Sequence, residues 1–263
     1  MLSRLTRSQA VAVCALPVVA LLATAVFAPL PFSVAQPGMT ADVLGKNRSA
    51  QVITVSGAPV RETSGQLRMT TIEATGPDTR VPLADVLGNW FRTDRAVMPR
   101  DAVYPSGNSV KEIEKYNAKQ MRQSQDAATQ AALKYLDLSP DKVKVRLKLA
   151  DVGGPSAGLL FTLGIIDTLD GDGRGGDLTG GRTVAGTGTI DAAGKVGAVG
   201  GVALKTQAAR RDGATVFLVP KAECSDARSE LPKGLRLVPV TTLQGAVNSL
   251  VALETGKGRV PSC

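Results

Sequence analysis

Histidine is absent from this sequence of 263 residues. A Ser-His-Asp triad, a Cys-His pair and a zinc site of the HExxH type therefore cannot be built from these residues. Acid–base chemistry has to come from lysine, acidic side chains, tyrosine, cysteine or a chain terminus. Among these groups, lysine is the best general base for a serine nucleophile.

Aromatic residues are also scarce, at 3% of the chain against 43% for all hydrophobic residues. We therefore expect a core of Ala, Val, Leu and Ile. The net charge is +8, but no run of five or more basic residues occurs. Because stacking aromatics are few and basic residues are dispersed, we expect no nucleic-acid partner.

Metal-binding patterns are missing as well. The stretch from Asp170 to Asp177 begins like a calcium loop, but Arg174 occupies a ligand position and no Glu stands at the twelfth place. We interpret it as a flexible, solvated loop, and we expect neither a metal nor another cofactor.

The N-terminus carries Arg4 and Arg7, followed by an uncharged apolar run over residues 10–28. This run is long enough to cross a bilayer, and the preceding positive charge predicts a cytoplasmic N-terminus with the body outside. Two interpretations remain open. Residues 1–35 are a retained single-pass signal anchor, or a signal peptide cleaved after Ala35 that leaves a secreted protein.

Only three cysteines are present. Cys14 lies inside the apolar run and is interpreted as an apolar filler. Cys224 and Cys263 follow in the body, which both interpretations place in an oxidising compartment. Two cysteines suffice for one bridge, so we predict a disulfide between them.

Alternating apolar residues predict strands over residues 51–55 and 66–73, joined as a hairpin. Further strands are predicted over 143–149, 183–190 and 216–219, and helices over 83–91, 109–136, 155–169, 203–212 and 243–253. This mixture predicts an α+β fold. The predicted divisions are the N-terminal segment 1–35, a β-containing extension 36–120, a catalytic domain 121–255 and a tail 256–263.

Ser156 follows two glycines and Pro155, at the start of the predicted helix 155–169. The unpaired amides and the positive end of a helix are suited to stabilising an oxyanion. Lys205 follows the apolar stretch 199–204, where partial desolvation would lower its pKa. Taken alone, Ser156 could equally be a structural serine, and Lys205 a solvated helix lysine.

Four ordered motifs change that balance: GPSAG at 154–158, GTGTI at 186–190, GKV at 194–196 and GGVALK at 200–205. Together they resemble the proteolytic domain of Lon proteases, and the resemblance extends over residues 121–253. It implies a Ser156/Lys205 dyad, with Thr187 holding the lysine. It also implies that the backbone amides of Ser156 and Gly154 stabilise the oxyanion.

Two departures from that family are visible. Gly153 stands where many Lon domains have Asp, and no GxxxxGK[ST] motif of an ATPase occurs. The chain is similar to membrane-anchored Lon-like proteases that usually carry a PDZ domain before the active serine. The segment between residues 136 and 156 is too short for one.

The resemblance therefore implies an ATP-independent extracytoplasmic serine endopeptidase that acts on polypeptides and contacts the membrane through its N-terminal segment. It also implies assembly into a homo-oligomer, as hexameric rings are common in the family. A catalytically silent Lon-fold scaffold or binding protein at the cell surface is the main alternative. A Ser/Lys enzyme of the signal-peptidase type is a third.

Overall fold

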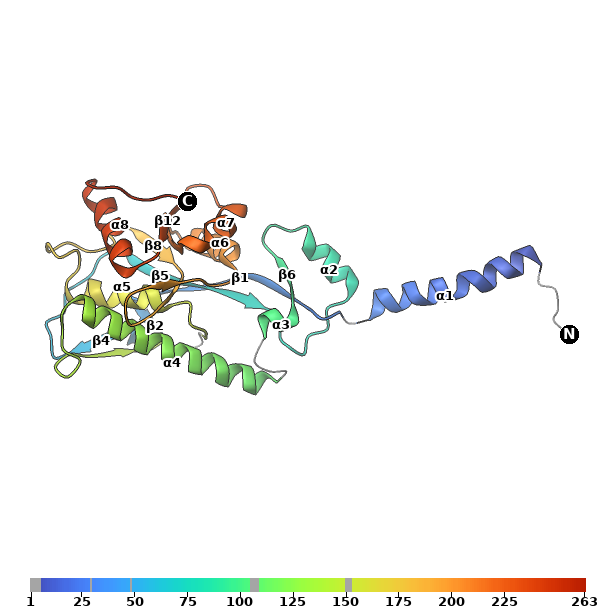
Figure 1. The fold of residues 1–263 in the computed structure, drawn as a ribbon, viewed down its shortest axis with the longest axis horizontal. Coiled ribbons are helices and arrows are strands. Elements are labelled where there is room, and N and C mark those ends of the chain that lie inside the picture. Colours follow the sequence, from blue (N-terminus) through green and yellow to red (C-terminus); the bar gives the residue numbers. More distant parts are fainter. Residues whose placement is uncertain (1–5, 29, 48, 105–108, 150–152) are drawn as a thin grey trace.

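The computed structural model describes residues 6–28, 30–47, 49–104, 109–149 and 153–263. It consists of one folded body from which a single long helix projects (Figure 1). That helix, α1, spans Arg7–Phe27 and is long and apolar enough to cross a membrane by length and composition. Arg4 lies outside the described residues.

The other helices are α2 Leu83–Trp90, α3 Arg100–Val103, α4 Val110–Tyr135, α5 Gly158–Leu169, α6 Val202–Arg211, α7 Cys224–Ser229 and α8 Leu243–Thr255, with a 3-10 turn over Lys221–Glu223. The strands are β1 Phe32–Asp42, β2 Lys46–Asn47, β3 Ala50–Gln51, β4 Ile53–Ser56, β5 Gln66–Ala74, β6 Ala96–Pro99, β7 Lys144–Leu147, β8 Thr183–Gly186, β9 Thr189–Ile190, β10 Val196–Gly197, β11 Val216–Pro220 and β12 Arg236–Val240.

A six-stranded sheet in the order β12-β11-β8-β5-β1-β6 forms the centre of the body. Strands β12, β11, β8 and β5 run parallel, whereas β1 is antiparallel to both β5 and β6. The predicted α+β class is confirmed. The sheet joins strands from the predicted extension and strands from the predicted catalytic domain into one structure.

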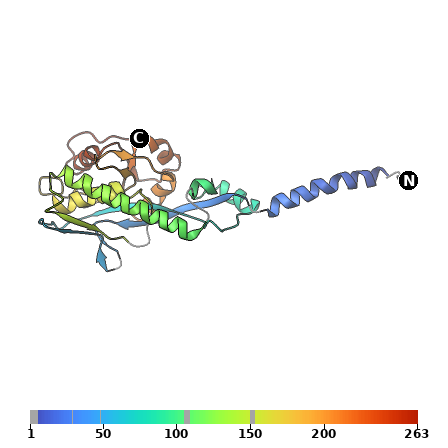
Figure 2. The ribbon, with the colours of Figure 1, turned by 60° about the horizontal axis from the view of Figure 1, so that its bottom comes forward.

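Both faces of this sheet are covered, which explains the continuous burial of β11. Side chains alternate between the faces: Leu218 packs in the larger core with α4, α5 and α8, and Phe217 in a smaller core with α6 and α7. Figure 2 shows α4 running along the length of the body, on the face that it shares with α5 and α8. The two catalytic candidates therefore come from opposite faces of the sheet: Ser156 directly precedes α5, and Lys205 lies on α6.

The predicted hairpin between residues 51–55 and 66–73 is wrong. Strand β4 pairs with β7 in a separate two-stranded sheet, while β5 lies in the main sheet between β8 and β1. The connection is too long for a tight turn to fix the pairing, so each strand takes a distant partner instead. The predicted strand 183–190 is likewise broken, at Thr187 and Gly188.

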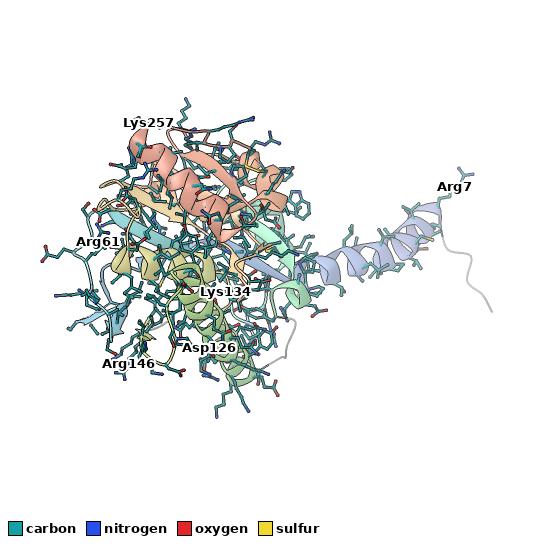
Figure 3. The ribbon with its side chains drawn as sticks, turned by 60° about the vertical axis from the view of Figure 1, so that its left-hand side comes forward. Arg7, Arg61, Asp126, Lys134, Arg146 and Lys257 are labelled. Atoms are coloured by element: carbon teal, nitrogen blue, oxygen red, sulfur yellow. A yellow bond between two sulfur atoms is a disulfide. The ribbon has the colours of Figure 1, made fainter. Side chains whose placement is uncertain are left out.

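Arg61 holds one side of the glycine-rich loop that follows α5, whereas residues 173–175 at its middle are exposed to solvent, as expected. The Arg61 guanidinium lies 3.5 Å from an Asp177 carboxylate oxygen and 4.0 Å from one of Asp167. It also donates a hydrogen bond to the Gly175 carbonyl oxygen over 3.0 Å. Figure 3 shows Arg61 at this edge of the body. Among the described residues, no group of three His, Cys, Asp or Glu side chains is placed to hold a metal ion.

Ala35, after which the sequence offers a signal-peptide cleavage site, lies inside β1. Its side chain is fully buried, and its backbone is paired in register with Ala74 on one side and Ala96 on the other. Cleavage after this residue would remove the part of β1 that pairs with β6. The predicted boundaries at residues 36 and 121 thus fall within β1 and α4.

The sulfur atoms of Cys224 and Cys263 are bonded, with 5.4 Å between the two Cα atoms. Cys224 opens α7, and both cysteines pack against the smaller core beneath α6 and α7. Arg228 on the same helix donates a hydrogen bond to the Cys263 carbonyl oxygen over 3.2 Å. The bond fixes the C-terminal tail to the body.

Replacing Cys263 by Ser should lower the free energy of unfolding by about 2–4 kcal/mol, because the unfolded chain loses a long covalent loop. Thermal unfolding under non-reducing conditions measures the change. Cys14→Ser is the matched control, since Cys14 is exposed on α1 and unpaired among the described cysteines. Equal melting temperatures for Cys263→Ser and the unmodified chain would contradict this role.

Candidate active site

Ser156 lies in the turn before α5, not in the first turn of the helix as predicted. Helix α5 begins at Gly158, with Ala157 as its N-cap residue. Gly154 has a φ of +91°, a conformation that favours glycine, and the chain turns sharply there. Ser156 is therefore presented on a bend at the N-terminal end of α5.

Three contacts hold this bend. The Ser124 hydroxyl on α4 donates to the Pro155 carbonyl oxygen over 3.0 Å. The Ser156 carbonyl oxygen accepts from the Gly188 amide over 2.9 Å and from the Thr187 hydroxyl over 3.4 Å. The backbone of Ser156 is thus tied to the segment that follows β8.

Lys205 lies on α6 with only 4% of its surface exposed. Its Nζ donates a hydrogen bond to the Thr187 hydroxyl over 3.2 Å. Burial lowers the pKa of the amine to about 8, although the carboxylates of Asp226 and Glu223 act in the opposite direction. A shift of this size corresponds to about 3 kcal/mol in favour of the neutral amine.

Thr187 connects the two halves of the site. It is fully buried directly after β8, and its amide donates to the Leu218 carbonyl oxygen of β11 over 3.1 Å. Its hydroxyl accepts from Lys205 and donates to the Ser156 carbonyl oxygen. The end of the parallel sheet therefore fixes the lysine relative to the serine loop.

A pocket of about 390 Å³ contains both Ser156 and Lys205. The Ser156 hydroxyl makes no hydrogen bond to Lys205 or to any other residue that the structure describes. Apolar side chains form much of the remaining wall: Ile72, Met98, Val103, Ile113 and Val199. The pocket thus combines a free hydroxyl, a buried amine and an apolar lining.

The predicted oxyanion donors are not both available in this structure. The Gly154 amide donates to the Asn117 carbonyl oxygen on α4 over 3.3 Å, so it is already engaged in this structure, and its role as an oxyanion donor stays a prediction. The amides of Ser156 and Ala157 are therefore the two at this bend without an acceptor among the described residues.

Gly153 explains why α4 approaches this loop so closely. A Cβ atom at Gly153 would lie 2.8 Å from the Cβ of Asn117, closer than real Cβ contacts. An aspartate at position 153 would therefore not fit beside α4 as it is placed here. The glycine and the contact between Gly154 and Asn117 belong to the same local arrangement.

Ser124, Asn117 and Asp226 also contribute to the site, and no motif in the sequence identified them. The Asp226 carboxylate accepts from the Val202 amide over 2.8 Å and from the Ala203 amide over 3.4 Å, and so caps α6. One feature of the sequence indicated that a distant side chain caps α6: the residues before this helix are glycines, which have no side chain to cap it. Its position cannot be derived from local sequence.

A larger pocket of about 550 Å³ lies elsewhere, between the C-terminal ends of α4 and α5. Its lining includes Tyr135, Leu138, Leu169 and Gln244 but no serine, cysteine or lysine. The smaller pocket is therefore the candidate site on chemical grounds.

Comparison with known proteins agrees with this choice. Residues 121–252 match the family model of the Lon protease (S16) C-terminal proteolytic domain. The Lon protease of Chloroflexus aggregans is 39% identical over 93 residues, which cover 34% of this chain and 10% of that protein. Lon protease 1 of Myxococcus xanthus is 33% identical over 114 residues, which cover 41% of this chain and 13% of that protein.

The chain thus spans only about a tenth of the length of these curated relatives. The family match itself covers half of this chain and includes Ser156, Thr187 and Lys205. The Lon-type proteolytic fold predicted from the sequence motifs is confirmed. This chain belongs to the Lon protease C-terminal proteolytic domain family.

Proposed function

We propose that this chain is an ATP-independent, membrane-anchored serine endopeptidase with Ser156 as nucleophile and Lys205 as general base. Family membership supports a serine peptidase. The observation that carries the finer assignment is the buried Lys205 amine, with a pKa of about 8, in the pocket that also contains the Ser156 hydroxyl.

In this mechanism, neutral Lys205 takes the proton of the Ser156 hydroxyl as Oγ attacks a peptide carbonyl carbon. The resulting ammonium returns the proton to the leaving amine when the C–N bond breaks. Lys205 then activates the water that releases the acyl group from Ser156. Thr187 keeps the amine in place, and the Ser156 amide donates to the developing oxyanion.

Polypeptides are the proposed substrates. No P-loop motif occurs in the 263 residues, which supports cleavage without ATP-driven unfolding. The pocket of about 390 Å³ is suited to a side chain of an extended segment, not to a folded domain. Assembly into a hexameric ring is proposed from the family resemblance alone.

The proposed location is extracytoplasmic, with α1 retained as a single-pass anchor. Arg7 at the start of α1 favours a cytoplasmic N-terminus, and the bond between Cys224 and Cys263 suits an oxidising compartment. Retention is favoured over cleavage because Ala35 is buried and paired on both sides within β1.

A catalytically silent scaffold is the second candidate, and one observation favours it. The Gly154 amide is engaged with Asn117, and Gly153 replaces the usual aspartate. A loop that never leaves α4 would lack one of the two donors implied by the resemblance. Direct labelling of the serine separates the two candidates.

A fluorophosphonate probe should label the purified full chain at Ser156. Labelling should vanish in Ser156→Ala and fall about 10²–10⁴-fold in Lys205→Met, the range for loss of a general base. Gel fluorescence and peptide mapping measure the extent and the site.

Ser139→Ala and Lys134→Met are matched controls, because both residues are exposed and lie outside the pocket. Lys134, labelled in Figure 3, is exposed on α4. Both controls should label normally. A folded, unlabelled wild-type chain would support the scaffold instead.

Labelling should also depend on pH through Lys205. The rate should rise about tenfold per unit below pH 8 and level off above it, because only the neutral amine acts as a base. Asp226→Asn keeps an oxygen to cap α6 but removes a negative charge that raises the pKa of Lys205. The midpoint of the pH dependence of labelling should therefore move to lower pH.

Asp126→Asn is the control for this charge change, since Asp126 is exposed on α4 (Figure 3). It should leave the midpoint unchanged. A shift of the Asp226→Asn midpoint to higher pH would contradict the role of the lysine as a neutral base.

Retention of α1 should be visible in intact cells. A C-terminal epitope tag should be digested by external protease, an N-terminal tag should be protected, and the chain should remain in membranes after carbonate extraction. Mass spectrometry should find the uncleaved chain. A soluble product beginning at Gln36 would support the secreted alternative.

A further inference from the structure

Helix α2 presents an unpartnered apolar stripe to the outside of the body. Leu87, Trp90 and Phe91 are 52%, 62% and 84% exposed, although tryptophan and phenylalanine normally bury most of their surface. Leu87 and Trp90 are spaced i and i+3 on one side of α2, and Phe91 follows directly as its C-cap residue. Val86, by contrast, is buried against the body.

This stripe is a local feature of one element. The other large apolar residues that are exposed outside α1 come from four segments, with two of them on α4: Met39, Val60, Val110, Tyr116 and Leu231. The stripe also contains the chain's single tryptophan. A cluster that includes exposed aromatic residues calls for a partner, whereas scattered single residues do not.

The position of α2 indicates which partner it has. Helix α1 ends at Phe27, and the Leu30 amide already donates to the Val81 carbonyl oxygen over 3.0 Å. Val81 is two residues before α2, and the Arg100 amide donates to the Pro31 carbonyl oxygen over 2.9 Å. The chain that leaves α1 is therefore fixed directly beside α2.

The spatial arrangement agrees with these contacts. Both views place α2 at the end of the body from which α1 projects (Figures 1 and 2). α1 and α2 also contact one another directly. The stripe is consequently held at the level where the apolar helix meets the body.

We propose that Leu87, Trp90 and Phe91 insert into the interfacial layer of the same bilayer that α1 crosses. Tryptophan and phenylalanine are suited to this layer, where an apolar ring can be buried beside lipid headgroups. The inference rests on the proposed membrane anchoring of α1. The stripe is too small for a stable protein interface, but a tethered helix needs little affinity of its own.

Docking of α2 has a consequence for the site. The chain continues from α2 into β6 and α3, and this segment supplies Met98, Ala102, Val103 and Tyr104 to the wall of the catalytic pocket. A docked α2 therefore orients that wall relative to the membrane. The substrates favoured by this arrangement are polypeptide segments close to the bilayer surface.

Trp90 makes the proposal measurable without any substrate. The full chain is reconstituted into phosphatidylcholine vesicles with or without brominated acyl chains, and the single tryptophan is excited. We expect brominated lipid to quench Trp90 and iodide in the water to quench it poorly. Leu87→Glu and Phe91→Glu should each reverse this pattern, with emission at longer wavelength and several-fold stronger iodide quenching.

Gly88→Glu is the matched control, because Gly88 is exposed on the same helix beside Leu87 and a Cβ there meets nothing within 4 Å. In this variant, brominated lipid and iodide should quench Trp90 to the same extent as in the unmodified chain. Thermal unfolding confirms that each variant is folded.

Carbonate extraction of the same vesicles reports on α1 separately. A chain that resists extraction but shows strong iodide and no bromine quenching overturns the docking of α2 and leaves the anchor intact. A chain released by carbonate overturns both. Protection from iodide without bromine quenching, varying with protein concentration, identifies a second copy of the chain as the occupant and also overturns the proposal.

Discussion

The proposed dyad depends on lowering the pKa of one buried amine, so that a useful fraction of it is neutral near pH 8. A buried ammonium without a carboxylate in contact is costly, and a neutral amine is not. Lys205 meets this condition because α6 lies against the sheet, where its first residues follow a left-handed Gly201 packed closely against Ile72. Asp226 caps the helix and adds charge nearby without a direct contact with the amine.

The sheet also fixes the position of Lys205 relative to Ser156. Strands β8 and β11 fix Thr187, and Thr187 in turn links the lysine to the serine backbone. The sheet is completed by β5 and β1, which lie outside the region matched by the family model. The N-terminal part of the chain therefore supports the site from within the same layer, and it also supplies part of the pocket wall.

The sequence predicted the elements that local signals specify. The predicted helix 109–136 forms as α4, and the Ser109 hydroxyl caps it by accepting a hydrogen bond from the Glu112 amide. The motifs around Ser156 and Lys205 led to the family that the comparison confirmed. The dyad itself remains a proposal, carried by the shared pocket and by Thr187.

Features set by distant partners could not be predicted. Alternation identified the strand at residues 66–73 but not its neighbours, because pairing is decided by the tertiary fold. Strand β1 was missed because its first residues look like a cleavage site. The engagement of Gly154 with Asn117 joins residues far apart in the chain, so no local pattern announces it.

The short connection between α1 and β1 limits where this protein can work. Only four residues separate Phe27 from Phe32, and an extended chain gains at most ~3.6 Å per residue. With α1 in a bilayer, the body has no stalk on which to swing outward. In that arrangement the body would be confined to a thin layer next to the lipid and would meet its targets by lateral diffusion.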